Sequence, residues 1–94
     1  MAADQVTHNE ESSRFELEVG GLTAVAEYVR NGNVLKFTHT EVPHEHRNQG
    51  IGHKLARGAL DHVRANGDRV VAQCPFIARF IQENPEYQGL LSNE

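Results

Sequence analysis

Two hairpin signals, Gly20-Gly21 and Asn31-Gly32, constrain the fold of this chain more than any other feature of its sequence. Both dipeptides favour the tight two-residue turns that connect neighbouring antiparallel strands. The segment 14–19 alternates apolar and acidic residues, which is the period of a strand with one buried face. The segments 22–30 and 34–42 have the apolar and β-branched content of two further strands. The sequence therefore predicts an antiparallel meander of three strands.

The pattern becomes helical after Pro43, which ends the third strand because proline lacks the N–H that a ladder needs. Apolar residues recur at helical spacing over 51–63, and Asn66-Gly67 supplies a C-terminal stop. The segment 69–73 predicts a fourth strand, and 76–83 predicts a second, short helix. The resulting order is β-β-β-α-β-α, an α+β fold. We expect the third and fourth strands to be parallel, because a helix connects them.

Length and composition exclude several classes of protein. The chain has 94 residues, enough for one domain, and its net charge of -4 argues against nucleic-acid binding. No apolar run approaches the ~20 residues that a membrane-spanning helix needs. The single cysteine, Cys74, cannot form an intramolecular disulfide. We expect a cytoplasmic domain preceded by a polar, disordered tail over residues 1–13.

The loop that precedes the first helix has the residues of a phosphate-binding site. It reads Arg47-Asn48-Gln49-Gly50-Ile51-Gly52. The first amides of a helix lack an internal partner, and glycines let an anion approach the backbone closely. A P-loop and a dinucleotide fingerprint are both excluded, since Lys54 is followed by Leu55 where those motifs need a hydroxyl residue or a glycine. A glycine that merely eases a tight turn remains the alternative.

The same loop resembles the Arg/Gln-x-x-Gly-x-Gly/Ala signature of the GNAT N-acetyltransferases. Three other blocks follow the order found in the short, single-domain GNAT-like branch. They are His39-Thr40-Glu41-Val42-Pro43, Cys74-Pro75-Phe76 and Asn84-Pro85-Glu86-Tyr87. The resemblance covers residues 14–91 and implies a reduced acyl-CoA N-acyltransferase fold.

The resemblance also implies how acetyl-CoA is bound as the co-substrate. Backbone groups of Glu41 and Val42, at the end of the third strand, are expected to pair with the pantetheine arm. The amides of residues 48–52, that is Asn48, Gln49, Gly50, Ile51 and Gly52, are expected to hold the pyrophosphate, with Arg47 adding positive charge. The thioester is expected between Glu41 and Cys74, where two strands separate.

Acetyl transfer to an amine needs a base for the amine and an acid for the leaving thiolate. Glu41, at the end of its strand, is a candidate base, or else an ordinary surface carboxylate. His39 shares its face and could also act as a base, or it could be a buried structural histidine bonded to the next strand. Cys74 precedes a helix and is a candidate acid or transient acyl carrier, or else a small buried residue. His44, His46 and His53 lack the partners of a metal site, and no metal is expected.

The chain departs from the family in the part that binds the acceptor. A Gly20-Gly21 turn stands where full-length members have two helices, and little sequence remains after the second helix. The acceptor, a small amine or a protein lysine, is therefore not identified, and a partner subunit could complete its site. Two alternatives to an acetyltransferase stay open: a non-catalytic acyl-CoA-binding or protein-interaction module, and a purely structural domain.

Overall fold

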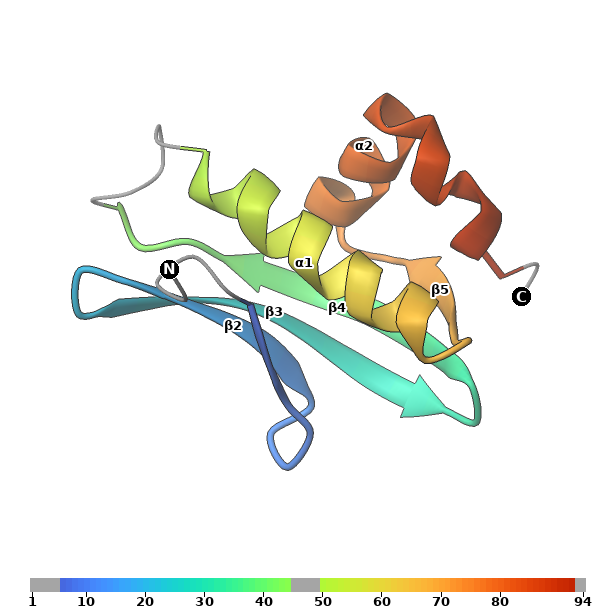
Figure 1. The fold of residues 1–94 in the computed structure, drawn as a ribbon, viewed down its shortest axis with the longest axis horizontal. Helices are drawn as coiled ribbons and strands as arrows, with labels where there is room; N and C mark the ends of the chain where they lie inside the picture. The colour runs from blue at the N-terminus through green and yellow to red at the C-terminus, as the bar shows by residue number, and fades with distance from the viewer. Residues whose placement is uncertain (1–5, 45–49, 93–94) are drawn as a thin grey trace.

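A twisted five-stranded sheet carries all of the helices on one of its faces (Figure 1). The computed structural model describes residues 6–44 and 50–92. The elements in chain order are β1 (Thr7–Asn9), β2 (Arg14–Val19), β3 (Leu22–Asn31), β4 (Val34–Glu41), α1 (Ile51–Ala65), β5 (Arg69–Ala72), α2 (Pro75–Glu83) and the 3₁₀ helix η3 (Pro85–Leu90). The predicted β-β-β-α-β-α order is confirmed from β2 to α2.

The strands lie in the sheet in their sequence order, from β1 to β5. The pairs from β1 to β4 are antiparallel, and β4 pairs with β5 in parallel, as predicted from the helix between them. Gly20 and Gly21 both have positive φ, and so does Gly32, which explains why glycine stands at these two turns.

The prediction that residues 1–13 form a disordered tail is wrong from residue 6 onward. Strand β1 pairs with β2, with Thr7 opposite Glu16, and Val6 is buried. The polar sequence gives no local signal for this strand, because the residue that Val6 packs against lies in a distant part of the chain. Gly58 in α1 leaves a space that Val6 fills so closely that a Cβ at residue 58 would overlap it. Residues 1–5 lie outside the described part of the chain.

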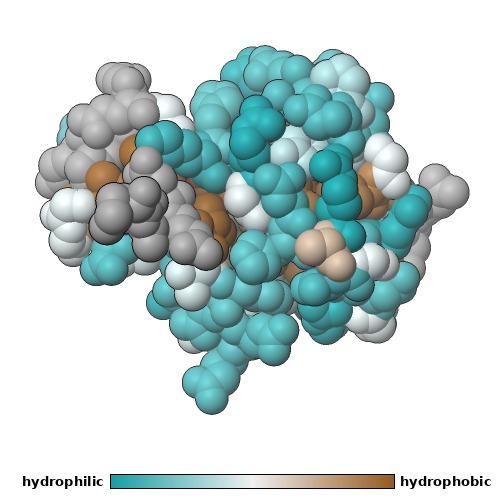
Figure 2. Space-filling view, viewed as in Figure 1, coloured by the Kyte–Doolittle hydropathy of each residue, from teal (hydrophilic) through white to brown (hydrophobic). Residues whose placement is uncertain are grey.

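The core is one apolar layer between the sheet and the helices. Helix α1 contributes its predicted stripe, and the strands contribute alternate residues. The members buried to 1% exposure or less include Phe15, Leu17, Leu35, Phe37, Leu55, Leu60, Val63, Val70, Ile77 and Phe80. On the face seen in Figure 2, the coloured residues are mostly hydrophilic, with hydrophobic residues visible in small areas between them. Among the described residues, no helix is long and apolar enough to cross a bilayer.

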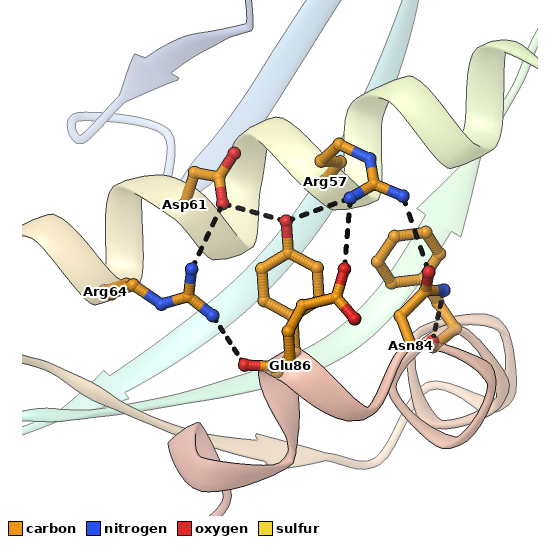
Figure 3. A network of polar contacts seen from close by, with 7 residues as sticks. Arg57, Asp61, Arg64, Asn84 and Glu86 are labelled. Atoms are coloured by element: carbon orange, nitrogen blue, oxygen red, sulfur yellow. Dashed lines mark hydrogen bonds and ion pairs between the residues drawn. The ribbon is translucent and has the colours of Figure 1, made fainter.

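The C-terminal helix η3 is fixed to α1 by a polar cluster that includes Arg57, Asp61, Arg64 and Glu86 (Figure 3) and has the Tyr87 hydroxyl as a shared partner. The buried Tyr87 hydroxyl donates to Asp61 Oδ1 at 2.8 Å and accepts from Arg57 Nη1 at 3.4 Å. Arg64 donates to the Glu86 carbonyl at 2.6 Å and lies over the Tyr87 ring. Burial first, and then the bond to Asp61, raises the pKa of Tyr87. These contacts close the apolar layer at its C-terminal end.

One irregularity in β4 determines which residues reach each face of the sheet. Tyr28 is opposite Phe37, but the next residue back on β3, Glu27, is opposite His39. Thr38 is therefore the extra residue of a β-bulge, and its hydroxyl donates to the Glu27 carbonyl at 3.4 Å. Since a bulge shifts the alternation by one, the residues after Thr38 face the opposite way from a regular strand.

Candidate functional site

A groove of about 680 Å³ lies between the end of β4 and the start of α1. Its lining comes from three elements that are distant in sequence: β4 and the residues after it, α1, and α2. The described lining residues are His39, Thr40, Glu41, Val42, Gly50, Gly52, His53 and Phe76. Four of the residues predicted from the sequence to hold the co-substrate thus lie in one groove, namely Glu41, Val42, Gly50 and Gly52.

Glycine occupies two positions at the start of α1, and the structural reason differs between them. Gly50 is the N-cap and has φ of 73°, in the left-handed region that residues with a Cβ rarely adopt. A Cβ built on Gly50 would meet no atom of the described residues within 4 Å. Gly52 is buried, and its Cβ would lie 2.8 Å from Cζ of Phe76. The second glycine therefore lets α2 pack against the first turn of α1.

The helix start presents backbone donors to the groove. The first bond within α1 runs from the Lys54 amide to the Gly50 carbonyl, at 3.0 Å. The amides of Ile51 and Gly52 precede it, so α1 provides no acceptor for them, and the described residues supply none. Such amides, together with the positive end of the helix dipole, can hold an anionic group. Of the predicted loop, Arg47, Asn48 and Gln49 lie outside the described residues.

The groove continues to a place where two strands part. Strands β4 and β5 pair only as far as Phe37 opposite Ala72, and the Cys74 amide then donates to the Phe37 carbonyl at 2.8 Å. From Thr38 to Glu41, β4 has no strand on that side in the described part of the chain. The predicted separation of the two strands between Glu41 and Cys74 is therefore present. It leaves the edge of β4 open to an extended ligand.

His39 and Glu41 lie on the face of the sheet that carries no helix in residues 6–44 and 50–92. Their register partners on β3 are Glu27 and Val25, whereas the buried Ala26 is opposite Thr40. His39 Nε2 lies 3.6 Å from Glu41 Oε1, and the two side chains are 57% and 71% exposed. The shared face is as predicted, but the alternative that His39 is a buried residue bonded to the next strand is wrong. The bulge at Thr38 is the reason, since it turns His39 outward.

Cys74 is buried, with 5% of its surface exposed, and does not belong to the described lining of the groove. Its Sγ lies 3.3 Å from Oγ1 of Thr40, and Thr40 does line the groove. Cys74 is also the N-cap residue of α2. A thiol in this position reaches the groove through the Thr40 hydroxyl rather than directly.

Two groove residues, Thr40 and Phe76, were not assigned a role from the sequence. Both stood in the blocks that carry the family resemblance, but Phe76 was interpreted as part of a helical apolar pattern and Thr40 as part of a strand. No single-residue signal could have found them, because the bulge and the packing of α2 bring them to the groove. His53, expected beside the glycine loop, does line the groove, with its ring centre 5.8 Å from that of Phe76.

Two other features of the described residues bear on function. No group of three or more His, Cys, Asp or Glu side chains within residues 6–44 and 50–92 is placed to hold a metal ion. A second groove of about 470 Å³ runs along the outer edge of β5, α2 and the C-terminal segment. Its described lining includes none of the residues predicted for the site.

Known families and structures match this chain over most of its length. A family model described as GCN5-related N-acetyl-transferase matches residues 14–90. Protein NATD1 from Bos taurus is 33% identical over 90 residues, which are 92% of this chain and 79% of the relative. Protein NATD1 from Gallus gallus is 32% identical over 92% of this chain and 81% of its own length.

The fold itself has a solved counterpart. The solution structure of a Staphylococcus aureus protein described as GCN5-like covers 100% of this chain and 93% of its own, with a TM-score of 0.72. The two sequences are 24% identical, so this likeness bears on the fold alone. The expected fold, a meander followed by β-α-β-α, is confirmed by this match and by the sheet.

Proposed function

Because the chain belongs to the GCN5-related N-acetyltransferase family, we propose that it binds acetyl-CoA and transfers the acetyl group to an amine. One observation carries the proposal. A single groove joins the donor-bearing start of α1 to the open edge of β4 and to the side chains of His39 and Glu41. This is the order in which pyrophosphate, pantetheine and thioester follow one another along coenzyme A.

The co-substrate is held mainly by the backbone. In this proposal the amides of Gly50, Ile51 and Gly52 bind the pyrophosphate, together with Arg47, Asn48 and Gln49 of the preceding loop. The surroundings of Gly50 support this, since no atom of the described residues lies within 4 Å of the position that a Cβ would take there. The pantetheine arm pairs with the edge of β4 at Glu41 and Val42, in the manner of an added strand.

The amine is activated by the pair on the uncovered face of the sheet. An alkylamine is protonated at neutral pH and must lose a proton before it attacks a thioester. Glu41 takes that proton, directly or through water, and His39, 3.6 Å away, can share it. The acceptor therefore approaches from the uncovered face. Cys74 supplies the proton for the departing thiolate through its contact with Thr40, or else it serves as a transient acyl carrier.

A second candidate is a non-catalytic acyl-CoA-binding or protein-interaction module. The observation that favours it is the exposure of Glu41, whose side chain is 71% exposed on the face of the sheet that carries no helix in the described part of the chain. Acetyl transfer would still be possible at such an open site in two cases. The acceptor could be a lysine on the surface of another protein, or a partner subunit could complete the site. If a partner subunit completes the acceptor site, the active form of the protein is an oligomer.

Titration with acetyl-CoA, followed by an assay with a panel of amines and lysine peptides, tests the proposal. We expect saturable binding that competes with free coenzyme A, and release of free thiol only when an acceptor is present. Binding without release against any acceptor would favour the non-catalytic module. No binding at millimolar coenzyme A would contradict both, and would leave the glycine loop as a turn.

We assign residues 14–91 as the acetyltransferase domain, with β1 added at the edge of its sheet. We also assign the reaction to the cytoplasm, where acetyl-CoA is available and thiols stay reduced, in agreement with the free thiol of Cys74. No metal, membrane or nucleic acid takes part in the proposed reaction.

A further inference from the structure

Thr40 connects the groove to a thiol that the groove does not reach. It lies on the helix side of β4, opposite Ala26, because the bulge at Thr38 reverses the alternation of the strand. Its hydroxyl oxygen is 3.3 Å from the sulfur of Cys74, within the longer range that hydrogen bonds to sulfur occupy. Cys74 is 5% exposed and is not among the described lining residues, whereas Thr40 lines the groove and contacts its sulfur.

The hydrogen-bonding capacity of the two groups favours one arrangement when the groove is filled. A threonine hydroxyl has one O–H donor and two acceptor lone pairs, and a thiol is a weak donor and a weak acceptor. If the Cys74 S–H donates to Thr40 Oγ1, the Thr40 O–H is available to a third atom in the groove. The backbone of Cys74 is held in place, because its amide donates to the Phe37 carbonyl and the residue is the N-cap of α2.

We propose that Thr40 is a catalytic residue, which donates a proton to the coenzyme A sulfur and recovers it from Cys74. This inference rests on the proposed acetyl transfer. The amine nitrogen forms a bond to the acetyl carbon, the carbon–sulfur bond breaks, and its electron pair stays on the coenzyme sulfur. That sulfur takes the Thr40 hydroxyl proton, and Thr40 takes the Cys74 thiol proton.

The proton balance closes within the same reaction. The attacking amine releases one proton to Glu41 or His39, which passes it on to solvent, and solvent returns a proton to the Cys74 thiolate. The products are the amide and free coenzyme A, with the protein unchanged. In this scheme Cys74 never carries the acetyl group, because the Thr40 side chain stands between its sulfur and the thioester.

Three variants test the role of the Thr40 hydroxyl. Thr40→Val keeps the shape and removes the hydroxyl, Thr40→Ser keeps the hydroxyl, and Cys74→Ala removes the proton source. We expect kcat to fall about 100-fold in Thr40→Val and to stay within about three-fold in Thr40→Ser. The double variant Thr40→Val with Cys74→Ala should be no slower than the slower single variant. Unchanged kcat in Thr40→Val, or fully additive losses, would overturn the proposal, as would an acetyl adduct on Cys74.

A binding measurement keeps this test separate from that of the proposed function. The wild type should bind coenzyme A about five-fold more tightly than desulfo-coenzyme A, and Thr40→Val should bind the two equally. Equal affinities in the wild type would overturn the role of Thr40 while leaving the acetyltransferase proposal to its own assay. If the groove binds neither compound, the proposed function fails first, and the role of Thr40 with it.

Discussion

Gly52 at the start of α1 lies against the ring of Phe76 at the start of α2, so closely that a Cβ on Gly52 would be 2.8 Å from Phe76 Cζ. Both residues line the groove. The position of the aromatic wall of the groove therefore depends on the absence of one methyl group.

The variant Gly52→Ala should displace the Phe76 ring into the groove and weaken coenzyme A binding several-fold. We expect a loss of about 1 kcal/mol of unfolding free energy, since the atom displaced is the far end of a side chain. Urea unfolding and calorimetric titration measure the two effects. The added change Phe76→Leu should restore binding to Gly52→Ala. It should not restore binding to Gly50→Ala, whose cost of about 1 kcal/mol comes from its left-handed backbone. Equal rescue of both would refute this account.

Changing Gly58 to alanine should destabilise the protein by about 1–3 kcal/mol, because the new Cβ overlaps Val6. In a Val6→Gly background the same change should become stabilising, by up to about 1 kcal/mol, through the higher helix propensity of alanine. Thermal unfolding of the four proteins in this cycle gives the coupling. The same sign of effect in both backgrounds would show that Val6 does not rest on α1.

Stability should fall as the pH is lowered through the range just below 6.5, because of His8. Its Nε2 lies 2.6 Å from the Tyr28 hydroxyl, and its ring stacks on Phe15 at 4.2 Å. Burial lowers the pKa of His8 below the ordinary 6.5; Glu10 opposes this, whereas His62 and Arg30 add to it. The unfolded chain therefore binds the proton more readily, and acid favours unfolding.

Urea midpoints at pH 7.5 and pH 5.5 measure this dependence. The difference between the two midpoints should shrink in His8→Gln and persist in the control His39→Gln, whose side chain is exposed. An unchanged difference in His8→Gln would assign the acid sensitivity to other groups.

Removing the Tyr87 hydroxyl should cost about 1–2 kcal/mol, since it leaves Asp61 and Arg57 without a shared partner. The variant Tyr87→Leu should cost more than Tyr87→Phe, because it also loses the ring that packs on Phe80 and lies beneath Arg64. Chemical denaturation compares them. If Tyr87→Phe were as stable as the wild type, the polar cluster in Figure 3 would contribute nothing to the attachment of η3.

The substitution Glu41→Gln should lower kcat about 100-fold with little change in the affinity for coenzyme A, because only the proton acceptor is lost. Glu18→Gln is the matched control, since Glu18 is an exposed carboxylate on β2, away from the groove, and it should leave kcat unchanged. Steady-state kinetics with the best amine found measures both. Equal kcat in the two variants would remove Glu41 from the mechanism.

Local patterns were sufficient to predict most of the elements. The turns at Gly20-Gly21 and Asn31-Gly32 and the stripe of α1 depend on near neighbours in sequence, and the structure has them where the patterns indicated. The start of α1 was equally local, because Gly50 and Gly52 mark it in the sequence. Val6 shows the limit of local patterns. It was predicted to lie in a disordered tail, because the residue it packs against, Gly58, is distant in sequence on α1.

The sequence by itself determined the strand and helix order and the glycine loop, because turn propensity and hydrophobic periodicity act over a few residues. Only the tertiary structure decided which side chains meet at the end of β4. The bulge at Thr38 depends on pairing with β3, and it turns His39 and Glu41 outward and Thr40 inward toward Cys74. Strict alternation along the strand would have given the reverse, since a shift of one residue exchanges the two faces of a strand.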